Sequence, residues 1–471
     1  MDDPAENFYA AERSADCPVG SLPVLPAWAR GADFVVVALL LVALTVSISG
    51  GFRTQVGDWT IALTAPLRPL GLAVAIALIR LRFARQQSMI GHLRQQIGAW
   101  ARSHDVTTAA TVTLFTRTAI LLVGYLAVSI IGNVSSAKPF FEFGSDLFNL
   151  QLRWDAGWYL QLARGGYDFQ RGSPHLQQNI AFFPAYPVTV RTLALLFGNS
   201  MGSYVLAATV ASIAFFFVAL VYLYRLSRQH VAPDVSETTV WLLATYPFAL
   251  FYGAIYTESL FLAGTLGAFY FMRDGRYVRA GVWGMVVGLA RPNGMLLSLP
   301  LALCVLELHL RGRQRLKAVC AAAMPGIAML GFSAYIWQLT GSPFTWAANH
   351  AAWGRHYTGL VGLVIDRYQY ISIYGLPTYV NHRPYDFLNG VAVLLVLASA
   401  WPVARRFSIA YAVFMLINIL PPLSAGGLLS AGRLTAVLFP TFLWLGSVIP
   451  QPHRQGSVSY THLTLPTIYS V

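Results

Sequence analysis

Long apolar runs recur along almost the whole 471-residue chain, interrupted by shorter polar segments. A helix needs about 20 apolar residues to cross the roughly 30 Å hydrocarbon core of a bilayer, and many of these runs approach that length. Charged residues make up only 11% of the chain, whereas about a quarter is usual in a soluble domain. We therefore predict an all-α, polytopic membrane protein.

About twelve apolar segments are candidates for transmembrane helices, and several of them are short, as expected for helices buried among others. Their predicted ranges are 33–50, 62–80, 113–132, 204–224, 238–254, 257–272, 279–292, 293–309, 318–338, 388–404, 408–422 and 433–449.

Arginine sets the predicted orientation, because loops that stay in the cytoplasm carry an excess of Lys and Arg. These loops and both termini are therefore expected inside. The net charge of +13 has the same explanation, since no basic run alternates with aromatic residues as binding of single-stranded nucleic acid would require. The segment after every second predicted span is basic, through Arg80, Arg82, Arg85, Arg94, Arg102, Arg225, Arg228, Arg273, Arg276, Arg279, Arg311, Arg313, Arg315, Lys317, Arg405 and Arg406.

One apolar segment, FFPAYPVTVRTLALLFG at 182–198, is not counted as a span. If it crossed the bilayer, the arginines that follow the fourth span would lie outside. We predict an amphipathic helix in the outer interface, with Arg191 reaching toward the headgroups. Residues 133–203 then form a large extracytoplasmic loop with two interfacial helices, and residues 339–387 form a second outer loop.

Three parts are predicted along the chain. Residues 1–110 form an N-terminal extension with two transmembrane helices, residues 111–456 form the main membrane domain, and residues 457–471 form a tail. The tail resembles an in-frame translation of a sequencing-library adapter and is left out of the fold prediction.

About thirty fairly polar residues precede the first apolar run, so no cleavable signal peptide is expected. The three cysteines show neither a disulfide framework nor zinc spacing.

The sequence RWDAGWYLQLARGGYD, residues 153–168, places an aspartate between two tryptophans in the first outer loop. Trp154, Trp158 and Leu162 recur at helical spacing, which predicts a short helix that starts near Asp155. Aspartate is favoured at a helix N-cap, so a structural interpretation of this residue stands beside a catalytic one. Asparagine caps a helix about as well, and an Asp155→Asn substitution therefore distinguishes the two.

Three further charged residues are predicted at the outer ends of apolar segments. Glu258 in YTESLF lies in a tight turn between two spans, where a carboxylate is costly unless it is paired or hydrated. It is thus a functional candidate, with a paired structural glutamate as the alternative. Arg291 in ARPNG and Arg433 in SAGRLTAVLFP each suit either a phosphate clamp or an arginine that reaches toward the interface. Carboxylates and arginines at one face fit an enzyme that acts on a lipid-linked phosphate substrate.

The second outer loop contains FTWAANHAAWGRHY, residues 344–357, with His350, Arg355 and His356. Two histidines without nearby carboxylates make a poor metal site. We expect neither a bound metal nor another cofactor.

Five motifs occur in the order seen in the PIG-V family of GT-C glycosyltransferases, which is related to the second mannosyltransferase of GPI-anchor assembly. They are RWDAGWYLQLARGGYD, FFPAYPVTVR, YPFALFYGAIYTESLF, GLARPNG and GRLTAVLFP. The chain resembles this family over about residues 113–449. Two features depart from the family pattern: the N-terminal extension, and Leu434 after Arg433, where relatives often have tyrosine.

The resemblance implies a GT-C helical bundle whose first large outer loop carries an aspartate beside the donor pocket. It also implies a polyprenyl-phosphate donor, with mannose as the sugar, and an acceptor hydroxyl on a lipid or envelope glycan. The expected location is a bacterial cytoplasmic membrane with the active site on its extracytoplasmic side. Asp155 is then the general base of an inverting transfer.

The resemblance and the residue chemistry together predict the other roles. Arg291 is the first candidate to stabilise the departing phosphate, ahead of Arg433 and Arg355. Glu258 is expected to orient sugar or acceptor hydroxyls, or to hold an arginine. The predicted substrate-binding residues are Arg153, Trp154, Trp158, Tyr167, Tyr186, Tyr256, Glu258, Arg291, Asn293, Arg355 and Arg433.

A lipid or solute transporter is the alternative function. Such proteins typically show inverted repeats and ionisable residues near the mid-plane of broken helices, and the sequence has no clear internal repeat. A non-catalytic membrane scaffold would leave Glu258 unexplained.

Overall fold

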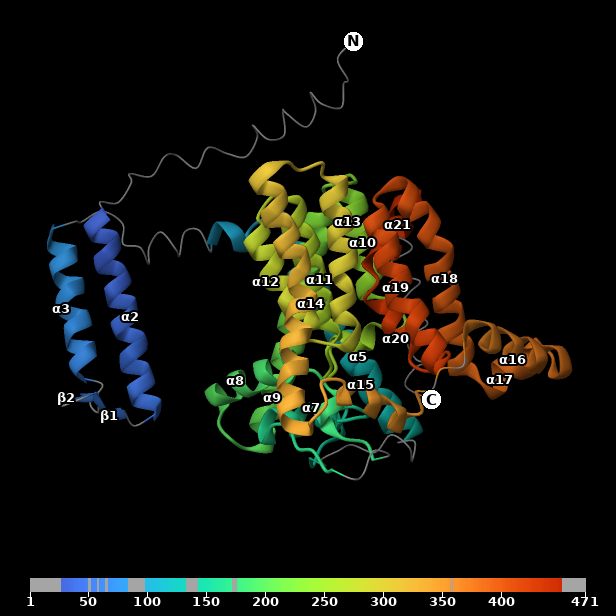
Figure 1. The fold of residues 1–471 in the computed structure, drawn as a ribbon, viewed down its shortest axis with the longest axis horizontal. Coiled ribbons are helices and arrows are strands. Elements are labelled where there is room, and N and C mark those ends of the chain that lie inside the picture. Colours follow the sequence, from blue (N-terminus) through green and yellow to red (C-terminus); the bar gives the residue numbers. More distant parts are fainter. Residues whose placement is uncertain are drawn as a thin grey trace, which may run out of the picture. The chain divides into compact units, whose positions relative to one another are not determined.

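The computed structural model describes residues 27–49, 52–56, 59–63, 67–83, 98–132, 143–171, 176–355, 357 and 359–450. The chain folds as two compact units, Met1–Ser103 and His104–Val471, coloured along the sequence in Figure 1. The predicted tail at 457–471 and His356 lie outside the described residues.

The described residues of the N-terminal unit include the helices α2 (Ala27–Ser49) and α3 (Leu67–Phe83), with a β-hairpin between them. Strands β1 (Phe52–Val56) and β2 (Trp59–Leu63) pair antiparallel, so β2 takes up the first residues of the second predicted span. The hairpin is a small exception to the all-α class.

The predicted position of Arg80 in a cytoplasmic loop is wrong. Arg80 lies inside α3 and is 2% exposed, with its Nε 3.0 Å from Oδ1 of Asp33 on α2. A buried guanidinium is tolerable when a carboxylate on a neighbouring helix compensates it. Hydropathy along the sequence contains no information about such a pairing, so a prediction based on it ends the span at the arginine.

The larger unit is helical throughout the part that the structure describes. Its elements are α5 (His104–Ile131), α6 (Asp146–Asn149), α7 (Ala156–Gly165), η2 (Asn179–Ala181), α8 (Ala185–Phe197), α9 (Met201–Ser227), α10 (Pro233–Ala244), η3 (Ala249–Tyr252), α11 (Glu258–Arg273), α12 (Tyr277–Gly288), η4 (Pro292–Leu297), α13 (Ser298–Glu307), α14 (Gly312–Thr340), α15 (Thr345–Asn349), η5 (His350–Trp353), α16 (Gly359–Tyr374), α17 (Leu376–His382), α18 (Pro384–Arg406), α19 (Ile409–Gly426), α20 (Ala431–Ala436) and α21 (Phe439–Val448).

Among the described residues, four helices are long and apolar enough to cross a membrane: α5, α9, α14 and α18. Each coincides with a predicted span. Of the remaining predicted spans, 33–50 coincides with the 23-residue helix α2. The others coincide with shorter helices or with two short elements in succession, such as η4 followed by α13. The chain is an all-α, multi-pass membrane protein, as predicted, while the count of twelve spans stays a prediction.

Some predicted spans are divided where the backbone leaves the α-helix. Residues 245–248, which include Pro247, separate α10 from η3 within the predicted span 238–254. Helices α7 and α8 occur where the two interfacial helices are predicted. The second outer loop contains α15, η5, α16 and α17, which the sequence analysis does not anticipate because they are short and lack a span-length apolar run.

Glycines allow the helices next to the site to approach closely. A Cβ on Gly288 of α12 would lie 2.2 Å from the carbonyl oxygen of Pro325 on α14, and one on Gly267 of α11 would lie 2.8 Å from the ring of Trp283 on α12. Small residues at helix interfaces permit the close packing on which membrane bundles depend. This packing fixes the end of α12, from which Arg291 extends.

The two ends of the bundle differ in their charged residues. At the end that we call the basic end, Arg225 of α9 pairs with Asp105 of α5. At the same end Glu307 of α13 lies 3.6 Å from Arg273 of α11, and it accepts a hydrogen bond from Ser408 before α19. The arginine-rich connections of this unit, which follow α9, α11, α13 and α18, lie at this end. Figure 1 shows the bundle helices side by side, with α7 and α8 at the opposite end.

Candidate active site

Asp155 immediately precedes α7, at the end of the bundle opposite the basic end. Its backbone N–H donates to the hydroxyl oxygen of Tyr256 at 2.8 Å. Its carboxylate makes no capping hydrogen bond to α7. Instead Oδ2 lies 2.9 Å from Nη1 of Arg433 in α20, and the aspartate side chain remains 29% exposed. The N-cap interpretation therefore does not explain this carboxylate.

Glu258 starts α11 and its side chain is only 1% exposed. Its Oε1 lies 2.8 Å from Nη2 of Arg291 and 3.0 Å from Nε of Arg433. The Nε of Arg291 also donates to Oγ1 of Thr257 at 3.0 Å. A carboxylate buried this deeply is stable only if it is paired, and two guanidinium groups meet that requirement.

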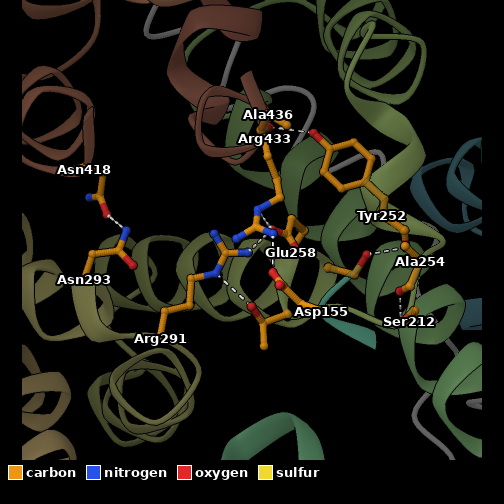
Figure 2. A network of polar contacts seen from close by, with 12 residues as sticks. Asp155, Ser212, Tyr252, Ala254, Glu258, Arg291, Asn293, Asn418, Arg433 and Ala436 are labelled. Carbon is orange, nitrogen blue, oxygen red and sulfur yellow. Dashed lines mark hydrogen bonds and ion pairs between the residues drawn. The ribbon is translucent and has the colours of Figure 1, made fainter. Parts of the chain in front are cut away.

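Arg433 joins the two carboxylates, since one side chain contacts both Asp155 and Glu258. Figure 2 shows these three side chains and that of Arg291 converging from four separate elements. Aromatic rings enclose them: the guanidinium of Arg433 lies 5.1 Å from the ring of Tyr256. Arginine suits such a site because its planar fork makes several directed contacts and also stacks on rings. We call Asp155, Glu258, Arg291 and Arg433 the charged cluster.

The backbone around Arg291 explains the motif ARPNG. Arg291 is extended between α12 and η4, with Pro292 at the first position of η4. A Cβ on Gly294 would lie 1.9 Å from the carbonyl oxygen of Val287, so only glycine fits. Asn293 donates to Oδ1 of Asn418 in α19 at 2.8 Å. Figure 2 shows this pair apart from the charged cluster, and its contact ties η4 to α19.

Backbone conformations that are rare for side-chain-bearing residues occur beside both partners of the Asp155–Arg433 pair. Trp154 has φ 52° and Ser430 has φ 60°, whereas His309 is the other non-glycine residue with positive φ in the described part of the chain. Such strain is concentrated at functional sites in proteins. Gly432 lets α20 press on Phe248, because a Cβ there would lie 2.0 Å from that ring.

Aromatic side chains near Asp155 form one connected group, in which Tyr159 meets Phe182 edge-on at 5.1 Å. Trp158 stacks on Phe182 at 5.8 Å and meets Trp353 edge-on at 5.7 Å. Tyr159 packs against Tyr256 at 5.9 Å. Burial raises the pKa of the Tyr159 hydroxyl, with Glu258 and Asp155 acting in the same direction, so this hydroxyl stays protonated.

Tyr167 and Tyr186 are predicted to bind substrate, but their hydroxyls make hydrogen bonds within the protein. Tyr167 donates to the carbonyl oxygen of Phe182 at 2.8 Å. Tyr186 is fully buried and donates to the carbonyl oxygen of Ala208 in α9 at 3.0 Å. Both side chains position α7 and α8 against the bundle, since their polar tips have partners within the fold.

The second outer loop brings Arg355 toward the charged cluster. Burial lowers the pKa of Arg355, Arg433 lowers it further, and Asp155 opposes the shift. His350 lies nearby in η5, and burial together with Arg355 lowers its pKa to about 4. No group of three or more His, Cys, Asp or Glu side chains in the described residues could hold a metal ion.

The structure changes the order in which the predicted arginines are candidates for contact with a substrate phosphate. Arg291 is 6% exposed, and it is engaged with Glu258 and Thr257. Arg433 is 20% exposed and reaches Asp155 directly. Arg291 is therefore a poor first candidate for contact with a substrate phosphate, and Arg433 and Arg355 are better placed.

Arg117 is a buried cation that the sequence analysis misses. It lies near the middle of α5, is 5% exposed, and donates to the carbonyl oxygens of Ala244 and Ala249, where α10 has ended. Its position as a single charge inside the apolar stretch TLFTRTAIL could have identified it, because ionisable residues within a span are functional candidates.

The family comparison supports the motifs. Residues 114–338 match the family model described as Mannosyltransferase (PIG-V), a segment that includes Asp155, Glu258 and Arg291 and ends before Arg355 and Arg433. The match confirms the predicted resemblance to the PIG-V family over this segment. No curated protein matches the chain.

Solved structures similar to the chain include two oligosaccharyltransferases. One is the Archaeoglobus fulgidus oligosaccharyltransferase in complex with Zn and sulfate, with 15% identity, 74% of this chain and 53% of that chain covered, and a TM-score of 0.41. The other is the oligosaccharyltransferase AglB from the same organism with an inhibitory peptide and a dolichol-phosphate, with 10% identity, coverage of 76% and 56%, and a TM-score of 0.37. The chain spans about half the length of these proteins.

Proposed function

We propose that the protein transfers mannose from a polyprenyl-phosphate donor to a hydroxyl of a lipid or glycan acceptor. The observation that carries this proposal is the partly exposed carboxylate of Asp155, held by Arg433 beside the buried Glu258. The family match supports the sugar and the reaction class. The lipid-linked donor follows from the family resemblance and from the position of the site at the end of a membrane bundle.

In the proposed reaction, the acceptor oxygen attacks the anomeric carbon while its proton passes to Asp155. The bond from that carbon to the phosphate oxygen breaks, and the electron pair stays on the phosphate. The attack comes from the face opposite the phosphate, so the anomeric configuration inverts. General-base assistance of this kind typically contributes about 10²–10⁴-fold in rate.

Two other members of the charged cluster, Arg433 and Glu258, hold Asp155 in place in this proposal. Arg433 fixes the orientation of the carboxylate, and Glu258 fixes Arg433. Of the two roles expected for Glu258, holding an arginine suits its burial better than contacting substrate, because its side chain is only 1% exposed. Arg355 adds positive charge where the phosphate departs.

We further propose that the charged cluster faces the extracytoplasmic side of a bacterial cytoplasmic membrane. The arginine-rich connections of the larger unit lie at the basic end, and the cluster lies at the other end. The positive-inside rule places the basic end in the cytoplasm. Soluble nucleotide sugars are cytosolic, and a lipid-linked donor would be available on the opposite face.

The test uses the full chain reconstituted in vesicles with a labelled polyprenyl-phosphate mannose and an extract of envelope lipids as acceptor. We expect label to move to an acceptor in the wild-type protein and not in Asp155→Asn at equal protein level. Movement of the lipid across the bilayer without transfer would favour the transporter alternative instead. Equal transfer by the variant would remove Asp155 from the mechanism.

A further inference from the structure

The short helix α20, which carries Arg433, rests on the backbone that follows α10. We call residues 245–256 the support segment; it contains the break after α10, then η3, and the connection toward α11. The ring of Phe248 packs against α20, and the hydroxyl of Tyr252 donates to the carbonyl oxygen of Ala436 at 2.6 Å, as Figure 2 shows. A helix of six residues is too short to be stable alone, so its position depends on these contacts.

The support segment also contacts the residues around both carboxylates of the charged cluster. The carbonyl oxygen of Tyr252 accepts from Oγ of Ser259 at 2.6 Å, and Ser259 follows Glu258 in the first turn of α11. Tyr256, at the end of the support segment, accepts the backbone N–H of Asp155. One stretch of backbone therefore makes contact beside three members of the cluster.

Arg117 of α5 binds the support segment at its break. Its Nη1 donates to the carbonyl oxygen of Ala249 at 2.5 Å, and its Nη2 donates to that of Ala244 at 2.9 Å. A helix end leaves carbonyl groups without intrahelical partners, and within a membrane such groups need partners inside the protein. One planar guanidinium serves both. The same guanidinium lies 4.4 Å from the ring centre of Phe216, which stacks on Tyr252 at 4.8 Å.

We propose that Arg117 is a positioning residue of the active site, which acts through the support segment on Arg433 and Asp155. The inference rests on the proposed function, in which Arg433 orients the carboxylate of the base. A guanidinium in the middle of a membrane span is costly to bury, and such residues are kept for a function. Here that function is to hold the interrupted backbone in the shape that brings the charged cluster together.

Loss of Arg117 should affect the chemical step more than substrate binding. Without the guanidinium, the two carbonyl groups at the break lose their shared donor, and α20 and Tyr256 are free to shift. A displacement of about 1 Å that starts far from the reacting atoms can cost about 10²-fold in rate. The side chains that contact the substrates are unchanged, so kcat falls while KM stays nearly the same.

The test measures kcat and KM for the full chain in vesicles, with labelled polyprenyl-phosphate mannose and an extract of envelope lipids. Rates are expressed per folded protein, as measured by size-exclusion chromatography. We expect Arg117→Gln to lower kcat by about ten- to a hundredfold and to change KM by less than about threefold. Arg117→Lys keeps the charge but lacks the planar fork, and its kcat should lie between those of Arg117→Gln and the wild type. Arg117→Lys carries the test if Arg117→Gln does not fold.

Arg80→Gln is the matched control for the loss of a buried cation. Arg80 is also a buried guanidinium in an apolar helix, and it pairs with Asp33 in the N-terminal unit. The control should leave kcat unchanged even if it lowers the amount of folded protein. An equal loss of kcat in Arg80→Gln and Arg117→Gln would overturn the proposal, as would a wild-type kcat in Arg117→Gln.

A double-mutant cycle tests whether Arg117 acts through the support segment. Tyr252→Phe removes the hydroxyl that binds Ala436 and should lower kcat by itself. In the Tyr252→Phe background, Arg117→Gln should lower kcat much less than it does in the wild type, because both changes release the same helix. Losses that multiply fully would mean that the two residues act independently, and would overturn the proposed route to α20.

Hydrogen exchange of the same variants separates this result from the fate of the proposed function. Arg117→Gln should raise amide exchange in the support segment and in α20, and leave the helices at the basic end as in the wild type. That pattern in a protein that transfers no mannose would support the positioning role and reject the transferase. Transfer that requires Asp155, with kcat and exchange unchanged in Arg117→Gln, would reject the positioning role alone.

Discussion

The two ends of the larger unit both join helices through ion pairs, but with very different burial. At the basic end the paired side chains of Arg273 and Glu307 are 21% and 27% exposed. At the site end Glu258 is 1% exposed and contacts two arginines. Exposed pairs contribute little to stability, whereas a buried pair is costly to break. The ion pair at the basic end thus only connects helices. At the site end the carboxylate of Glu258 is buried away from water, and the two arginines stabilise its charge instead.

The largest expected difference between the ends concerns activity. Asp155→Asn should reduce mannose transfer by about 10²–10⁴-fold, because the base is lost while the shape is kept. Asp105→Asn makes the same chemical change at the basic end and should leave the transfer rate within a few-fold of the wild type. Rates with labelled donor at equal protein levels check both. A comparable loss in the two variants would show that the effect comes from the fold and not from the site.

The next difference concerns stability. Glu258→Gln leaves two guanidinium groups without their shared carboxylate and should lower the free energy of unfolding by about 3–5 kcal/mol. Glu307→Gln removes the charge that faces Arg273 and one of the two oxygens that accept from Ser408 and Ala410, and it should cost only about 1 kcal/mol. Thermal unfolding in detergent compares them. Equal shifts would mean that burial does not distinguish the two clusters.

The two ends should lose stability alike in acid, because each contains a histidine whose pKa is lowered by burial. Burial lowers the pKa of His350 near the site and of His230 at the basic end, each to about 4, with Arg355 and Arg273 respectively adding to the shift. The unfolded chain takes up these protons near pH 6.5, before the folded one does, so stability falls as the pH drops from about 6.5 toward 4. His350→Gln and His230→Gln should each remove on the order of 2 kcal/mol of that loss at pH 4. Melting temperatures between pH 4 and 7 test this, and an unchanged acid slope in either variant contradicts it.

The smallest expected effect comes from backbone strain. His309, in the connection between α13 and α14, has φ 48°, and His309→Gly should raise the unfolding free energy by up to about 1 kcal/mol without changing transfer. Ser430→Gly should stabilise the fold similarly but reduce transfer, because Ser430 sets the start of the helix that carries Arg433. If both glycine variants retain full activity, strain at the site end is structural only.

The sequence predicts the membrane class and most helix positions because both follow from apolar composition along the chain. It also identifies Asp155, Glu258, Arg291 and Arg433 individually, since charged residues stand out at the ends of apolar segments. Their pairing is not predictable in this way, because Arg433 and Asp155 meet only through tertiary packing. For the same reason a linear reading places Arg80 in a loop and ranks Arg291 above Arg433. Arg117 is missed because one charge inside a long apolar run is easily averaged away.

The reach of Arg433 across 278 positions to Asp155 has a consequence for biosynthesis. A nascent chain that has inserted its helices only as far as α19 contains the aspartate and the glutamate, yet lacks the guanidinium that joins the two carboxylates. Such an intermediate would hold Glu258 against Arg291 alone and leave Asp155 unoriented. We therefore expect the protein to be inactive in the membrane until α20 has left the translocon, and to become active in one step.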